Sequence, residues 1–144
     1  QPSALKLLQE EANYGLQRLQ TYLDFQLRAN KIKDNLLAFL IEQKHTGKKV
    51  VAYGAAAKGN TLLNYAGVKP DLLPYVCDAA AAKQGKFMPG SHIPIFPPCE
   101  LANGQTDYVL VLPWNLLDEV QQQNAELKVK GVRFVTAVPE LVIQ

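Results

Sequence analysis

The sequence predicts an α/β fold: a three-layer domain with a mostly parallel five-stranded sheet, preceded by a long helical arm. Two observations support this prediction. Residues 3–46 follow a helical period, and after them short β-branched runs alternate with helix-prone segments. The β-branched runs end in turns of small or polar residues. We therefore expect the arm at residues 1–47 and the sheet domain at residues 48–144.

The composition is that of one ordinary globular domain. A chain of 144 residues with 48% hydrophobic and 19% charged residues can bury a single core. The net charge of +2 comes without a basic stripe, and no stretch reaches the roughly 20 apolar residues of a membrane span. We therefore expect neither nucleic acid nor a membrane as a partner.

The cysteines and the chain start suggest a cytoplasmic fragment. Cys77 and Cys99 lack the spacing of zinc ligands, so we expect reduced thiols and no metal. No signal peptide opens the sequence, which favours a cytoplasmic location. Gln1 follows no initiator methionine, and we expect the chain to be part of a longer protein.

The arm is predicted from apolar residues at steps of three and four, with Ser3 as N-cap and Gly47 after the helix end. This stripe consists of Leu5, Leu8, Ala12, Leu16, Leu19, Leu23 and Leu27. It loses phase at residues 29–31, so we expect two helices or one bent helix. An unbroken helix would measure about 60 Å, against about 35–40 Å for a compact domain of this size. The arm therefore folds along the sheet or protrudes and docks on another domain or a second copy, as in a homodimer.

The first strand, at residues 50–53, leads into a small-residue turn and a helix. This arrangement opens nucleotide-binding βαβ units, where a phosphate lies at the helix N-terminus. The candidate substrate-binding residues here are Gly54, Ala55, Ala56, Ala57, Lys58, Gly59 and Asn60. The alternative is that the small residues only allow close packing of strand and helix. Lys58 would then be a solvated side chain.

The second strand is predicted at residues 72–78 and ends in an acid. Asp78 follows Gly54 at roughly the 20-residue spacing at which Rossmann-type domains place a ribose-binding carboxylate. A turn or N-cap role is the alternative. Residues 79–82 are helix-prone, and the glycine-punctuated loop of residues 83–92 contains His92, which is either an acid–base or phosphate-binding group or a structural one.

Three further elements complete the predicted sheet. Residues 93–95 are expected to form a short strand, in which Pro94 indicates a sheet edge or a bulge, and Pro97 and Pro98 begin a short helix. Residues 107–112 are a buried strand, and residues 132–138 are the last strand. Between them Asn115 is expected to cap a helix at residues 116–127, and Trp114 either stacks on a ligand or plugs the sheet edge.

Ligands of open α/β sheets bind beyond the carboxyl ends of the strands. Those ends carry the residues named above, but the sequence contains no nucleophile elbow, HExxH motif or Walker A motif. The residues therefore indicate a ligand-binding domain without a catalytic set.

Three segments together resemble the C-terminal domain of sugar C-methyltransferases: residues 53–60 (YGAAAKGN), 83–95 (KQGKFMPGSHIPI) and 112–119 (LPWNLLDE). The resemblance implies a three-part enzyme with a zinc-binding N-terminal domain, a central S-adenosylmethionine-dependent domain and this Rossmann-like domain. A nucleotide-linked deoxysugar would lie between the last two, with the catalytic groups mainly in the central one. Residues 79–82 (AAAA) depart from the polar stretch expected there, so a ligand contact at that point is in doubt.

The favoured interpretation is thus a non-catalytic domain that positions the nucleotide diphosphate of a nucleotide-linked sugar. The first alternative is an NAD(P)-binding domain of an oxidoreductase or redox sensor, although the methyl group of Ala56 would crowd a dinucleotide. The second alternative is a structural docking or oligomerisation module, for which the arm is the best support.

Overall fold

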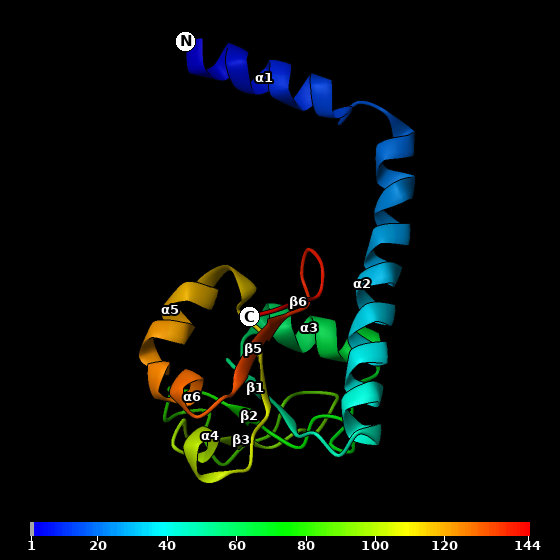
Figure 1. Ribbon diagram of the computed structural model, residues 1–144. Helices are drawn as coiled ribbons and strands as arrows, with labels where there is room; N and C mark the ends of the chain where they lie inside the picture. The colour runs from blue at the N-terminus through cyan, green and yellow to red at the C-terminus, as the bar shows by residue number, and fades with distance from the viewer. Residues whose placement is uncertain (1) are drawn as a thin grey trace. The chain divides into compact units, whose positions relative to one another are not determined.

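The computed structural model describes residues 2–144, which form two compact units: the residues up to Lys31, and Ile32–Gln144. The first unit contains α1 (Pro2–Tyr14) and the start of α2 (Leu19–His45) (Figure 1). Among residues 2–144, no helix combines the length and the apolar character needed to cross a membrane.

The helix break lies earlier than the predicted loss of phase at residues 29–31. Gly15 adopts a left-handed φ of +87° directly after α1, and its N–H donates to the carbonyl of Ala12 at 3.0 Å. The hydroxyl of Thr21 then donates to the carbonyl of Gly15 at 2.8 Å. Only glycine takes this conformation readily, so the position of Gly15 decides where the helix ends. Ser3 lies inside α1 and is not its N-cap.

The second part of α2 belongs to the sheet domain. Its side chains Leu36, Phe39 and Leu40 are buried in the core, so the compact unit begins at Ile32, before the boundary predicted after residue 47. Of the two arrangements open for this half of the arm, the helix laid along the sheet is therefore the observed one. Gly47, with φ of +71°, follows the helix end as predicted.

The sheet has six strands in the order β3-β2-β1-β4-β5-β6, of which the first five are parallel. The predicted number of five was wrong, because β6 adds an antiparallel edge strand next to β5. It is only two residues long and shows no alternation in the sequence. The strands are β1 Val50–Tyr53, β2 Val76–Cys77, β3 Ile95–Phe96, β4 Tyr108–Val111, β5 Arg133–Thr136 and β6 Val142–Ile143.

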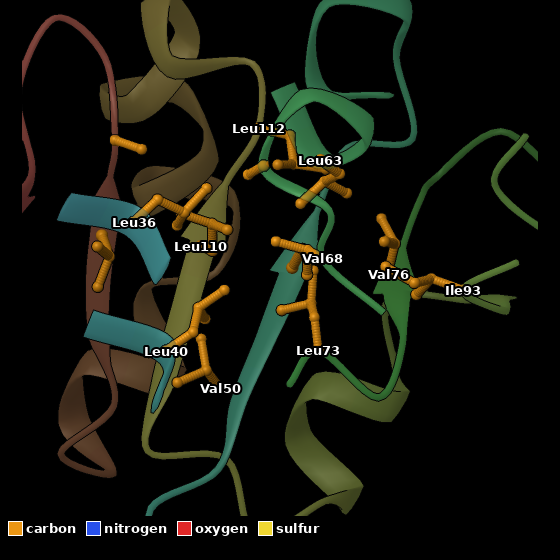
Figure 2. Close-up of a cluster of buried hydrophobic side chains, with 14 of the residues drawn as sticks. Leu36, Leu40, Val50, Leu63, Val68, Leu73, Val76, Ile93, Leu110 and Leu112 are labelled. Atoms are coloured by element: carbon orange, nitrogen blue, oxygen red, sulfur yellow. The ribbon is translucent and has the colours of Figure 1, made fainter. Parts of the chain in front are cut away.

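Helices cover both faces of the sheet, as predicted. Val50 and Ala52 of β1 pack in the core that contains α2 and α3 (Ala57–Ala66), whereas Val51 and Tyr53 pack in the opposite core. Figure 2 shows the first core, where Leu36, Leu63 and Leu110 come from α2, α3 and β4. The second core lies under α4 (Glu100–Asn103), α5 (Leu117–Gln123) and α6 (Ala125–Val129). Because successive side chains of a strand point to opposite faces of the sheet, each face carries its own core, and the domain has three layers.

Several predicted elements are shorter than expected. The second strand covers only Val76–Cys77, since Pro74 cannot donate a ladder hydrogen bond, and residues 79–82 are not helical. The helix predicted at residues 116–127 is divided into the short 3₁₀ turn η1 (Trp114–Leu116), α5 and α6. The prolines correctly indicated an edge strand, because β3 lies at the end of the sheet.

Candidate functional site

The carboxyl ends of β1 and β4 mark the point where the strand order reverses. β1 leads outward to β2 and β3, and β4 leads the other way to β5. The loops that follow these two ends are residues 54–56 and residues 112–113. Open α/β sheets bind ligands at such a switch point, so the candidate site lies beyond the carboxyl ends of β1 and β4.

Both glycines of the predicted turn are needed for close packing. A Cβ on Gly54, whose φ is +93°, would lie 2.5 Å from Cδ of Pro113. A Cβ on Gly59 would lie 2.6 Å from the Cβ of Leu112. The two loops therefore touch, and α3 lies against the end of β4. The close-packing interpretation accounts for these two glycines, while Ala55 and Ala56 are half-buried and border open space.

Asp78 holds the loop after β1. Its Oδ2 accepts hydrogen bonds from the N–H of Ala55 at 2.7 Å and from Lys83 Nζ at 3.0 Å, and its Oδ1 accepts from the N–H of Ala80 at 2.8 Å. Burial alone would raise the pKa of Asp78, but these three donors outweigh it and lower the pKa below its usual range. The carboxylate thus organises the turn, and the predicted ribose contact stays a prediction.

We expect this carboxylate to make stability depend on acid pH. The pKa of Asp78 is lower in the folded chain than its unfolded value of 3.8. The stabilisation by the ionised carboxylate is therefore complete above pH 3.8 and is lost as the pH falls through the folded-state pKa. At neutral pH, Asp78→Asn should lower the free energy of unfolding by about 1.5–3 kcal/mol. The difference from the unsubstituted chain should shrink as the pH falls below about 4.

Urea unfolding of both proteins between neutral and acid pH measures this difference. Asp71→Asn is the control, because Asp71 forms an exposed ion pair with Lys44 at 3.0 Å and should matter little. A difference between the Asp78 variant and the unsubstituted chain that does not change with pH would contradict the assigned role of the carboxylate.

A cleft of about 460 Å³ opens beside the loop after β1. This volume lies within the range of about 300–1,000 Å³ that is typical of small-molecule sites. One wall is the start of α3 and the loop before it, and the other is formed by residues 82–89 and the start of β3. The lining residues are Ala55, Ala56, Ala57, Asn60, Ala82, Lys83, Lys86, Phe87, Met88, Pro89 and Ile95.

The second wall is held in place by backbone hydrogen bonds. Ile95 donates to Lys86 at 2.8 Å and Met88 donates to Ile93 at 2.8 Å, so the segment forms a hairpin. The side chain of Asn64 on α3 donates to the carbonyl of Pro89 at 2.9 Å. The cleft is therefore preformed rather than bordered by a loose loop.

The first turn of α3 offers donors at the cleft. The N–H groups of Ala57, Lys58 and Gly59 have no hydrogen-bond acceptor among residues 2–144, and no side chain caps the helix at Ala56. Beside this turn, Oδ1 of Asn60 is buried and without a partner in the described part of the chain. An anion suits such a helix terminus, and the buried oxygen can accept a hydrogen bond from a ligand.

Lys58 faces a different group of residues. Its Nζ lies 4.6 Å from the centroid of the Trp114 ring and donates to Oδ1 of Asn115. We call these three residues the Trp114 cluster. Asn115 therefore does not cap the following helix as predicted, since Leu116 precedes α5 and no side-chain cap is formed there.

Comparison with known proteins places the chain in a family. Residues 1–139 match the family described as the C-methyltransferase C-terminal domain. The chain belongs to this family. The chain is 33% identical over 139 residues to the C-methyltransferase NovU of Streptomyces niveus, and the match covers 96% of this chain and 33% of that protein. The chain thus spans about a third of that relative's length.

A solved structure is also similar: UDP-D-quinovosamine 4-dehydrogenase from Vibrio fischeri, at 24% identity and a TM-score of 0.47, covers 62% of this chain and 76% of that one. The family match confirms the predicted resemblance. The strand order confirms the Rossmann-like α/β fold.

His92 occupies a turn rather than the cleft. It has a left-handed φ of +59°, its N–H donates to the carbonyl of Met88 at 3.0 Å, and its side chain is exposed. The geometry shows a hairpin residue, and His92 does not line the cleft. Burial raises the pKa of the Cys77 thiol to about 12, which removes it as a nucleophile at neutral pH.

The structure divides the predicted site residues into separate groups. Ala55, Ala56, Ala57 and Asn60 line the cleft, Asp78 supports it, and Lys58, Trp114 and Asn115 form the Trp114 cluster. Sequence reasoning missed the basic residues Lys83 and Lys86 and the aromatic Phe87. The sequence carries a signal for them, because the segment of residues 83–95 is part of the family resemblance, but a glycine-punctuated loop does not show which of its side chains line a cleft.

Proposed function

We propose that this domain binds the nucleotide diphosphate of a nucleotide-linked sugar, while another domain of a longer protein binds S-adenosylmethionine and carries out the methyl transfer. The observation that supports this most is the cleft, which combines a free helix N-terminus, basic side chains and an apolar wall. Family membership supports the methyltransferase context, the substrate class is what the resemblance to sugar C-methyltransferases implies, and the residues that line the cleft suit it.

The diphosphate would lie on the first turn of α3. Three N–H groups there are unsatisfied within the described residues, and the helix dipole favours negative charge by about 0.3–1 kcal/mol. Lys86 lines the same cleft, and its side chain has no partner within residues 2–144. Lys83 lies between Asp78 and the cleft, so it screens the phosphate from that carboxylate.

The nucleoside would occupy the apolar side of the cleft. Phe87 is 63% exposed although it lines a cleft, so its ring is available for stacking on a base. Asn60 on the opposite wall offers its buried Oδ1 to a donor on the ligand. A flat ring with polar edges attached to a diphosphate matches both walls.

We propose that S-adenosylmethionine and zinc belong to other parts of the longer protein. Among residues 2–144, no group of three or more His, Cys, Asp or Glu side chains could hold a metal ion. The described residues therefore do not fit a zinc site. The acid at the end of β2, which could bind a cofactor ribose, is engaged by three protein donors.

Calorimetric titration tests the proposal. A thymidine diphosphate hexose should bind, whereas NAD and S-adenosylmethionine should not. Lys86→Gln should weaken binding about tenfold, the equivalent of one charge-assisted hydrogen bond. Lys130→Gln is the matched control, because Lys130 is an exposed lysine directly after α6 and does not line the cleft. Tight binding of NAD would favour the oxidoreductase alternative, and binding of none of the three would favour a docking module.

We also propose that the arm docks on the methyltransferase domain or on a second copy of the chain. Its leucines are strongly exposed; Leu5, Leu8 and Leu19 are 69%, 61% and 73% exposed. Deleting residues 1–28 should therefore reduce self-association or domain docking, while the sheet domain keeps its cooperative unfolding. Sedimentation and thermal unfolding of the shortened chain measure the two effects. If the shortened chain fails to fold, the arm is part of the core and the proposal is wrong.

A further inference from the structure

The Trp114 cluster lies next to the cleft without belonging to it. The indole is half-buried, and its backbone is held by the 3₁₀ turn, in which Leu116 donates to Pro113 at 2.7 Å. Pro113 in turn packs against Gly54. The ring is thus a fixed platform at the end of β4, and the ammonium of the exposed Lys58 lies 4.6 Å from its centroid.

The first turn of α3 lies between the cleft and this cluster. Ala57 and Asn60 of that turn line the cleft, whereas the intervening Lys58 contacts Trp114 and Asn115. A diphosphate bound to the N–H groups of the turn would therefore have the cleft on one side and the indole on the other. A nucleotide-linked sugar has the same order of parts: nucleoside, diphosphate, sugar.

We propose that Lys58, Trp114 and Asn115 form the subsite for the sugar, so that the sugar end of the ligand points toward the carboxyl end of β4. This inference rests on the proposed function. The C–H face of a pyranose packs on an aromatic ring, and its hydroxyls bond to an amide such as that of Asn115. Lys58 would leave the indole to pair with the diphosphate, which uncovers the ring for the sugar.

The chemistry of the free state supports this exchange. An exposed ammonium gains little from an aromatic ring, and a phosphate oxygen is a stronger partner for it. The sugar would also be directed away from the nucleoside in the cleft, toward the carboxyl end of β4. A methyl-donating domain would then have to approach the sheet from that end of the strand.

The test compares a thymidine diphosphate hexose with thymidine diphosphate. Trp114→Ala should weaken binding of the sugar-bearing ligand about tenfold and leave binding of thymidine diphosphate within about twofold. Trp114→Phe should retain most of the affinity. Lys128→Ala is the control, because Lys128 of α6 lies 5.9 Å from the centroid of the Phe134 ring of β5, in a lysine–aromatic pair outside the Trp114 cluster. It should change neither affinity.

Fluorescence provides an independent measurement, since Trp114 is the only tryptophan of the chain. The sugar-bearing ligand should change its emission more than thymidine diphosphate does, and Lys58→Ala should alter the emission before any ligand is added. Equal effects of Trp114→Ala on both ligands, or no effect on either, would overturn the subsite. If the unsubstituted chain binds neither ligand, the proposed function fails and this inference fails with it.

Discussion

Replacing Gly54 by alanine is expected to lower the free energy of unfolding by about 2–5 kcal/mol. Two costs add at this position. A φ of +93° is strained for an L side chain, at about 1–2 kcal/mol, and the new Cβ would lie 2.5 Å and 2.8 Å from Cδ and Cγ of Pro113. Overpacking of this kind costs about 1–3 kcal/mol, because the ring of Pro113 cannot rotate away.

Gly67→Ala separates the two costs. Gly67 has a similar φ of +68°, but no atom lies within 4 Å of a Cβ built there. Gly67→Ala should therefore lower the free energy of unfolding by only about 1–2 kcal/mol, the cost of the left-handed conformation. Denaturant unfolding of both variants measures the difference. Equal losses would show that the loops after β1 and β4 do not need their close contact.

Replacing Ala56 by leucine is expected to weaken nucleotide-sugar binding by about a hundredfold or more, equivalent to about 2.7 kcal/mol. Ala56 lines the cleft directly before α3, so a larger side chain would occupy the space of the proposed diphosphate. Its backbone is extended, at φ −111° and ψ 161°, a conformation that leucine adopts without strain. Binding should therefore fall much more than stability.

The control for this change is Ala38→Leu, which adds the same side chain to an exposed position of α2. Titration calorimetry and thermal unfolding of both variants distinguish a local block from a general loss of structure. If Ala56→Leu binds the nucleotide-sugar as well as the unsubstituted chain does, the ligand does not lie on the first turn of α3.

The sequence by itself determined the architecture of the sheet domain. Alternation of β-branched runs with helical segments is a local pattern, and burial on two faces follows from it directly. The small-residue turn after β1, the acid after β2 and the proline-marked edge strand were predictable for the same reason. Each depends on the conformation of a few consecutive residues; the turn and the acid lie where the pattern placed them, and the edge strand lies at Ile95–Phe96, overlapping the predicted residues 93–95.

The family was also recognisable from the sequence, because three separated segments that resemble it occur in order along the chain. The end of the first arm helix was less visible. The apolar stripe continues through Gly15, so the periodicity gave no warning, and the left-handed conformation of that glycine ended the helix. Strand β6 was missed because its two residues gain their structure only by pairing with β5.

Only the tertiary structure decided which side chains share a site. Lys58 and Asn60 are neighbours on one helical turn, yet Asn60 lines the cleft and Lys58 lies on Trp114. Lys83 and Lys86 reach the cleft because a hairpin far along the chain is hydrogen-bonded to α3. The physical reason is that hydrophobic periodicity specifies the face a residue buries. The positions of exposed polar residues depend instead on contacts between distant segments, which no local pattern contains.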